Sequence, residues 1–564
     1  MKNTFKNRIK ENWNSGITVA LISVPLSIAL SIASGAGPVP GLVTGIWATL
    51  IASIFGGSNY NIIGVAGALT TVLFAATLSA PLALGAYVLP ILALCTGLII
   101  LAVWAIHADR FLYYIPSSVM YGFSAGVAFL IAVSQIFDAT GLSKLKRTGH
   151  FITDLKLFFV HIDTVHIPTI VCFFSFLAFV LIWKRNVKKI PAVIPTSIIG
   201  IIFGFLEVTY FNQNLISLGD KFGEFKATLF ATVPWQTIPT LGTNVHNIEW
   251  IFKTSLLIAL IAILETLITA KIGDSLTKTQ SSSSKELFGL ALANIGSGIC
   301  GGLPATGVFI RTGANIKAGA THKTSATITA IATGVIALLV LPFFTYIPMA
   351  VIAALLINTA LGLIETEKFK MFWMYEKSSF WISVTVILIT IFEDAGVAVM
   401  IGALLALLHF ANIVSHGRFD IILNYADGRR EDIRGKMNLH VHYNGNPEIV
   451  TYSIAGFLGY IDSWRHSANL RQLAHSPEVS NVIIRLRDLY VMDFEAQETF
   501  KEALAYLHSS GKSVYISSVN NQILSRISDL PFLDESSDDK RLFSKTSDAL
   551  IAIRARNKSL ILPQ

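Results

Sequence analysis

Charged residues are scarce in this chain of 564 residues: 14% are Asp, Glu, Lys or Arg, and 53% are hydrophobic. A soluble globular domain has about 25% charged residues, so this composition excludes a chain that lies mainly in water. Cysteine is also scarce. Cys95, Cys172 and Cys300 lie inside apolar segments with neither metal-ligand spacing nor a disulfide pattern. We predict that they are packing residues, and we predict no metal site and no cofactor.

Sequence motifs for catalysis and for nucleic-acid binding are also missing. The chain has no nucleophile with its base, no phosphate-binding glycine loop and no hydrolase carboxylate pair, so no enzyme is predicted. The formal net charge of +8 comes from basic residues scattered over short loops. A nucleic-acid-binding protein would gather them on one soluble face. Membrane topology explains the positive charge better, and no nucleic-acid partner is predicted.

Long apolar runs dominate the first three quarters of the chain, whose mean hydropathy is +0.61. Runs such as 167–183 and 326–344 approach the roughly 20 residues that a helix needs to cross a bilayer. The breaks between runs predict fourteen segments, near 16–34, 40–55, 62–77, 82–104, 117–138, 167–183, 190–206, 250–273, 286–301, 308–318, 326–344, 347–364, 379–394 and 396–413. With the basic N-terminus in the cytoplasm, the positive-inside rule is mostly obeyed. The chain is therefore predicted to be a multi-pass α-helical protein of the inner (plasma) membrane.

The sequence becomes mixed and polar after about residue 414. Residues 448–454 and 482–486 have the pattern of strands, 495–509 that of a helix, and 513–517 that of a third strand. This order predicts a small α/β domain with a strand–helix–strand crossover. The expected domains are 1–413 in the membrane, a linker over 414–435, and a soluble domain over 436–564.

Two of the predicted segments are short and interrupted. Residues 61–76 carry Gly64 and Gly67 near their start, and residues 304–318 contain Pro304, Gly307 and Gly313. Broken helices in transporters mark binding sites at the middle of the bilayer. If both helices begin there, their free backbone N–H groups would face one cavity and suit an anion. The alternative is that these glycines only allow close helix packing.

Two charged residues lie inside apolar segments. Glu265 follows the unbroken apolar run 256–264, and Thr269, four residues on, shares its helix face. A buried carboxyl group favours its neutral form, so Glu265 could take up and release a proton, or it could only hold a neighbouring helix. Arg311 lies in the second broken segment with no acidic residue nearby in sequence. It could attract anions, or it could pair with Glu265 as a structural bridge.

Longer stretches resemble the SulP family of sulfate and bicarbonate permeases. The run ITVALISVPLSIALSIASGAGPVPGL, followed by FGGSNYNIIGVAGALTTVL, is similar to the opening of that family. The run GDSLTKTQSSSSKELFGLALANIGSGICGGLPATGVFIRTGANIKAGA resembles its most recognisable stretch. The C-terminal part resembles the STAS domain that these permeases have. The resemblance extends over the whole chain, with long motifs in matching order.

The resemblance implies a fold of two inverted repeats of seven segments, divided into a core and a gate, with a cytoplasmic α/β STAS domain and a homodimer as the usual assembly. It implies an anion site between the starts of the third and tenth segments. It also places the coupling carboxylate at Glu265, with Thr269 on the same face. The implied substrate-binding residues are Ser23, Leu26, Leu30, Ala66, Gly67, Ala68, Phe309, Ile310 and Arg311.

The chain departs from the family pattern at several positions. Sodium-coupled relatives tend to have Asp where this chain has Glu265 and a small hydroxyl residue where it has Phe309, which favours proton over sodium coupling. Ala66 stands where many relatives have a hydroxyl residue. In the STAS resemblance, Phe494 and Glu495 follow Asp493 where bacterial regulators place a phosphorylatable serine, so no phosphoswitch is expected there.

Three functional hypotheses follow. The first is a secondary active transporter of small inorganic anions, with sulfate or bicarbonate as the expected substrate, coupled to protons and working by an elevator movement of the core against the gate. The second is a dicarboxylate, nucleobase or chloride carrier, or an anion exchanger, on the same fold. The third is a membrane sensor that acts through the STAS domain. Besides the anion and the proton, the expected partners are membrane lipid and a second copy of the chain.

Overall fold

A computed structural model shows a chain that divides into two compact units, Met1–Leu407 and Leu408–Gln564. Each unit has its own hydrophobic core. The structure describes residues 2–81, 88–107, 116–142, 145, 148, 151–187, 190–211, 213–223, 225, 228–231, 245–393, 395–415, 418–434, 447–533 and 541–561.

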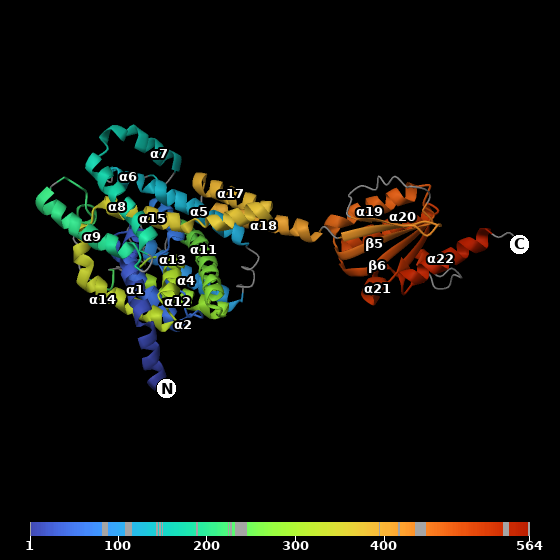
Figure 1. Ribbon diagram of the computed structural model, residues 1–564, viewed down its shortest axis with the longest axis horizontal. Helices are drawn as coiled ribbons and strands as arrows, with labels where there is room; N and C mark the ends of the chain where they lie inside the picture. Colours follow the sequence, from blue (N-terminus) through green and yellow to red (C-terminus); the bar gives the residue numbers. More distant parts are fainter. Residues whose placement is uncertain are drawn as a thin grey trace. The chain divides into compact units, whose positions relative to one another are not determined.

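The first unit is helical (Figure 1), and each of the fourteen predicted segments coincides with a helix. These helices are α1 (Lys2–Ala33), α2 (Pro38–Phe55), α3 (Gly67–Ser79), α4 (Val88–Ala105), α5 (Ser117–Ser134), α8 (Ile167–Asn186), α9 (Val193–Leu206), α11 (Val245–Thr277), α12 (Ser283–Ile299), α13 (Phe309–Lys317), α14 (Thr324–Val340), α15 (Met349–Leu363), α17 (Lys377–Phe392) and α18 (Ala395–Ser415). Four shorter helices lie between them: α6 (Ile136–Ala139), α7 (Phe151–Val160), α10 (Leu218–Phe222) and α16 (Thr366–Tyr375).

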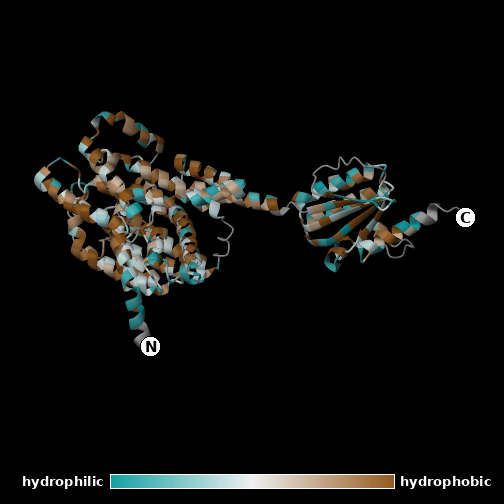
Figure 2. Cartoon of the chain, viewed as in Figure 1, coloured by the Kyte–Doolittle hydropathy of each residue, from teal (hydrophilic) through white to brown (hydrophobic). Residues whose placement is uncertain are grey.

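Helix length and composition fit a membrane protein. Within the described ranges, nine helices are long and apolar enough to cross a bilayer, and hydrophobic residues cover most of this unit (Figure 2). Helices α3, with 13 residues, and α13, with 9, are too short to cross alone. They are the two segments that the glycine and proline pattern predicted to be interrupted.

Helix contacts in the first unit come in matching pairs. Helix α4 packs on α12 as α14 packs on α2, α1 packs on α14 as α11 packs on α4, and α5 packs on α17 as α15 packs on α8. If each of the first seven helices is replaced by the helix at the same place among the last seven, and the reverse, the first contact of each pair becomes the second. Two structural repeats require this correspondence. The contacts also group α1–α4 with α11–α14, and α5, α8 and α9 with α15 and α17. These groups correspond to the expected core and gate, with α18 as the remaining gate helix by its place in the repeat.

Two short extended segments join the halves in the core. Strand β1 (Ile63–Gly64) pairs antiparallel with β2 (Thr306–Gly307), with Ile63 opposite Gly307 and Gly64 opposite Thr306. Helix α3 begins three residues after β1 and α13 begins two residues after β2. The pairing therefore fixes the starts of the two short helices close to each other.

The second unit contains a six-stranded sheet with the order β4-β3-β5-β6-β7-β8. Strands β5 to β8 are parallel, and β3 and β4 are antiparallel additions at one edge. The strands are β3 (Arg418–Asn424), β4 (Arg430–Arg434), β5 (Ile449–Leu458), β6 (Asn481–Met492), β7 (Ser513–Ser517) and β8 (Leu542–Phe543). The helices are α19 (Tyr460–His475), α20 (Phe494–Ser509), α21 (Asn521–Ile527) and α22 (Thr546–Ile561).

The predicted strands and helix of this unit are confirmed as β5, β6, α20 and β7, with β6–α20–β7 as the crossover. The predicted linker over 414–435 is wrong. Residues 418–434 form the β3–β4 hairpin, and Phe419, Ile421 and Leu423 belong to the buried core. In β3 every second residue is apolar and faces the core, while the other residues of these strands are mostly polar. So short and so polar a stretch has the composition of a linker, and composition alone does not distinguish the two.

Candidate anion site

The starts of α3 and α13 lack side-chain caps. Ala66 and Val308 are the residues before the first turns, and neither has a side chain that bonds to the helix. The first N–H groups of a helix have no partner within the helix, and the helix dipole makes this end positive. Both starts are largely buried, since Ala66, Gly67 and Ala68 are enclosed and Phe309 and Ile310 are partly so. Two positive helix ends are thus held together inside the unit.

Arg311 adds a full positive charge to this region. Its side chain is completely buried, and its Nη2 donates to Ser27 Oγ of α1 at 2.9 Å. Nε and Nη1 have no hydrogen-bond partner, and among the described residues no carboxylate forms an ion pair with it. The proposed bridge between Arg311 and Glu265 is therefore not formed. A buried charge without a counter-ion is costly, and a bound anion would supply the missing partner.

Gly64 makes room for this arginine. A Cβ atom at position 64 would lie 2.6 Å from Arg311 Nη1. The guanidinium group thus lies directly against the backbone of β1. On α1, Ser23 lies one turn before Ser27, and its Oγ is buried without a partner. The predicted residues Leu26 and Leu30 are also buried and contribute to the core of the unit.

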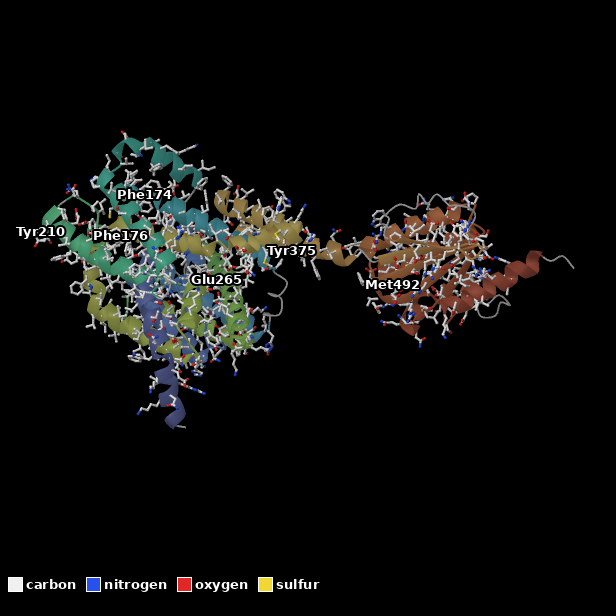
Figure 3. All side chains as sticks on the ribbon, in the orientation of Figure 1. Phe174, Phe176, Tyr210, Glu265, Tyr375 and Met492 are labelled. Carbon is white, nitrogen blue, oxygen red and sulfur yellow. The ribbon has the colours of Figure 1, made fainter. Side chains whose placement is uncertain are left out.

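Glu265, labelled in Figure 3, and Thr269 lie on α11, and this helix packs against β2. Thr269 Oγ1 donates to the carbonyl oxygen of Gly307 at 3.3 Å, and Thr266 Oγ1 accepts from the Gly307 N–H at 2.8 Å. The Glu265 carboxyl group interacts with the Thr306 hydroxyl, while its Oε2 is buried without a partner. The carboxyl group is therefore next to the strand that sets the start of α13.

The gate contributes residues that sequence reasoning missed. A Cβ atom on Gly67 would lie 3.0 Å from Leu363 Cδ1 and 3.7 Å from Ile131 Cδ1, and one on Gly362 would lie 3.4 Å from Ile310 Cδ1. The end of α15 therefore lies against the starts of both short helices. Nothing in the sequence singled out Gly362 or Leu363, because their apolar surroundings in sequence give no sign of which helix they face.

A buried carboxylate holds the loop before β1 in place. Glu286 of α12 accepts hydrogen bonds from the N–H groups of Gly57 and Ser58, both at 2.8 Å, and from Asn61 Nδ2 at 2.7 Å. Asn61 Oδ1 in turn accepts from Thr312 Oγ1 at 3.0 Å. This chain of contacts connects α12 to the first turn of α13. Sequence analysis missed Glu286, although its polar type at the start of a predicted span was a usable signal.

Fold and site together define a class: multi-pass membrane transporters built from two repeats, with two interrupted helices that begin at one site. Comparison with known protein families identifies the family within this class. The family model described as "Sulfate permease family" matches residues 9–386, about two thirds of the chain. The chain belongs to this family, as its motifs indicated.

Relatives in this family have been named for sulfate and bicarbonate transport. The putative sulfate transporter YvdB of Bacillus subtilis is 26% identical over 498 residues, which cover 87% of this chain and 88% of that protein. The bicarbonate transporter BicA of Picosynechococcus is 24% identical over 408 residues, 71% of this chain and 70% of that protein. The structure of murine Slc26a9, an anion transporter in the inward-facing state, has a TM-score of 0.79 at 15% identity and covers 98% of this chain and 92% of that one. The structural likeness concerns the fold.

Proposed function

We propose that the protein is a secondary active transporter of a small inorganic anion, sulfate or bicarbonate, and that protons drive the transport. One observation carries the proposal: the uncapped starts of α3 and α13 meet at the β1–β2 pair, and buried Arg311 lies beside them with two guanidinium nitrogens unpartnered. Peptide N–H groups and a guanidinium fork are the donors that an oxyanion accepts. The family relatives named for sulfate and bicarbonate narrow the class of anion.

The proposed substrate contacts are the residues inferred from the family resemblance. Ser23 and Arg311 offer side-chain donors, and Ala66, Gly67, Ala68, Phe309 and Ile310 belong to the two helix starts, while Leu26 and Leu30 form an apolar wall on α1. Ser27 is added to this set as the residue that orients Arg311. A site of this kind recognises charge and size more than chemical identity, which is why the second hypothesis, a dicarboxylate or chloride substrate, is included in the binding test.

Glu265 is the proposed coupling residue. Its Oε2 has no hydrogen-bond partner among the described residues, and its helix neighbours Thr266 and Thr269 bond to Gly307, two residues before α13. A proton bound there would remove a negative charge from the neighbourhood of the anion site. Binding of the proton and binding of the anion would then favour each other, which is the thermodynamic requirement for symport.

The proposed movement is an elevator-type displacement of the core against the gate. The core is internally tied by Glu286, Asn61 and Thr312, whereas the contacts that link the end of α15 to the two short helices are apolar. Apolar contacts have no fixed hydrogen-bond register and can be remade after a shift. We further propose a homodimer in the inner membrane, with the second unit as a cytoplasmic STAS domain.

Uptake into proteoliposomes tests proton coupling. An inward proton gradient is expected to accelerate uptake of labelled sulfate or bicarbonate, and Glu265→Gln is expected to abolish this acceleration, because an amide cannot bind and release the proton. Glu249→Gln changes an exposed carboxylate on the same helix and is the matched control. Stimulation by a sodium gradient, or gradient-driven uptake that survives in Glu265→Gln, would contradict the proposed role.

Binding of sulfate, bicarbonate, nitrate, chloride and succinate to the purified protein tests the site. The Arg311→Gln substitution is expected to weaken binding of the preferred anion about 10- to 100-fold, since a charged hydrogen bond contributes about 1.5–3 kcal/mol. Arg311→Lys is expected to recover part of this loss because it restores the charge without the planar fork. Unchanged affinity in both variants would place the site elsewhere.

A further inference from the structure

The second unit exposes a group of large apolar side chains at one end of its sheet. We call them the aromatic end. They come from the last residues of β5 and β6 and the first turns of α19 and α20: Phe457, Tyr460, Ile461, Trp464, Tyr490, Val491 and Phe494. Phe494 is 73% exposed, Tyr490 67%, Tyr460 61% and Trp464 60%. Met492, the last residue of β6 and labelled in Figure 3, is buried beneath this group.

Strand geometry explains why these side chains gather there. Strand β3 pairs with β5 only as far as Ala455, and β7 pairs with β6 only as far as Arg485. Beyond those points, β5 and β6 continue as a two-stranded extension with two register shifts. Such bulges re-aim side chains. Leu458, Leu489 and Met492 point into the core, whereas Phe457, Tyr490 and Val491 point outward.

The aromatic end is not arranged to bind a phosphate or another anion. Asp493 already occupies the starts of both helices, since its Oδ1 accepts from the Ala496 N–H at 2.7 Å and its Oδ2 from the Tyr460 N–H at 2.8 Å. Both carboxylate oxygens of Asp493 are thus engaged by helix N–H groups. What is left for a ligand is aromatic surface, and contiguous apolar surface of this kind marks an interaction site.

The connection between α18 and β3 shows which apolar surface the aromatic end can reach. Strand β3 starts at Arg418, three residues after α18 ends, and Arg418 is the partner of Ala455 at the aromatic end. Three residues of extended chain span at most about 11 Å. Helix α18 is one of the fourteen predicted membrane segments, and Leu408, Phe410 and Ile413 in its last turns are exposed apolar residues. The aromatic end is therefore the end of the sheet that is joined to a membrane helix.

We propose that the aromatic end is a membrane-interface anchor, with Tyr460, Trp464, Tyr490 and Phe494 inserted at the headgroup level of the bilayer. Tyr and Trp have an apolar body and a polar tip, and they are enriched where membrane and water meet. The charged residues that flank them are of both signs, with Arg487 and Arg526 among Asp488, Asp493 and Glu495, so they do not form a basic cluster. Apolar insertion then dominates over attraction to anionic lipid, so contact with the bilayer is expected to depend little on salt.

Lipid-borne quenching in nanodiscs that hold one full-length chain tests this anchor. The three native cysteines are replaced by alanine, and a fluorophore is attached to a single new cysteine in Phe494→Cys or Tyr490→Cys. Ser509→Cys is the control, because Ser509 is exposed at the opposite end of the same helix α20. Phosphatidylcholine with a nitroxide near the headgroup is expected to quench the labels at 494 and 490 at least about two-fold more than the label at 509, with less quenching by aqueous iodide.

Two other outcomes overturn the proposal. If the labels at 494 and 490 are open to iodide and respond to lipid nitroxide no more than the label at 509, the aromatic end lies in water. If they are shielded from iodide but insensitive to lipid nitroxide, protein covers them; shielding that appears only in discs with two chains identifies that protein as a second copy. Anion uptake by the labelled variants shows that the transporter is intact, so failure of the anchor is distinguishable from failure of the proposed function.

Discussion

At the scale of residues, the central feature is a buried arginine, Arg311, whose only hydrogen bond within the described part of the chain goes to a serine. Two of its guanidinium nitrogens lack partners. Buried charged groups are normally paired or hydrogen-bonded throughout, so the arrangement is costly unless a ligand completes it. That the protein keeps such a costly group buried indicates that Arg311 serves binding. The contact with Gly64 shows how closely the arginine is packed against its surroundings.

The fit between Gly64 and Arg311 gives a prediction. Gly64→Ala places a methyl group 2.6 Å from Arg311 Nη1, a distance at which the guanidinium must move. We expect anion affinity to fall about ten-fold, by about 1.4 kcal/mol. Gly313→Ala is the matched control, since a Cβ atom there meets nothing within 4 Å and alanine is the better helix former. Equilibrium binding of the preferred anion measures both.

A double-mutant cycle sharpens this prediction. If Gly64→Ala acts by displacing Arg311, it should cost little more in an Arg311→Gln background, because contacting residues are not additive. Equal losses in both backgrounds would mean that Gly64 acts independently of the arginine.

At the scale of elements, two two-residue strands decide where the short helices begin. Hydrogen bonds between them are few, so the surrounding side chains must supply the rigidity. Thr49 Oγ1 donates to the Ile63 carbonyl oxygen at 2.5 Å. Asn294 Nδ2 donates to the Ala305 carbonyl oxygen, and Asn294 Oδ1 accepts from the Ala305 N–H. The position of each helix start is thus determined by polar contacts from α2 and α12, the helices that precede β1 and β2 in the chain.

Glu286 of α12 accepts three hydrogen bonds from the loop before β1, and its role can be tested. In Glu286→Gln, one acceptor oxygen becomes an NH₂ group that faces N–H donors, and each buried donor left unpaired costs about 1–3 kcal/mol. We expect a clear fall in the thermal unfolding temperature of the purified protein, together with weaker anion binding. Glu367→Gln, at an exposed position on α16, should change neither. A variant that unfolds normally and binds normally would show that the loop before β1 does not depend on Glu286.

At the scale of the whole molecule, the chain combines two units whose buried cores share no residues. Independent cores unfold independently when few contacts cross between them. Phe500 lies in the core of the second unit and is 2% exposed. Phe500→Ala is expected to destabilise that unit by about 3–5 kcal/mol. Calorimetry should show one transition shifted downward while a second transition stays in place.

The same variant separates transport from signalling. A transporter whose chemistry lies in the first unit should retain anion uptake when Phe500→Ala loosens the second, and a chain that ends after residue 414 should still rescue growth of an uptake-deficient strain. Loss of uptake and of rescue in both cases would favour the third hypothesis, in which the second unit is the working part.

The sequence alone determined the class, the fourteen helices, the two interrupted segments and three of the six strands, because hydropathy and glycine placement are local properties of the chain. It could not assign residues 418–434, because β3 forms by pairing with β5 and β4 forms by pairing with β3. Nor could it choose between an Arg311–Glu265 bridge and an unpaired arginine, or find Glu286 and Leu363 as neighbours of the site. Those facts depend on whether residues tens to hundreds of positions apart lie within a few ångströms of each other, and only the tertiary structure fixes such distances.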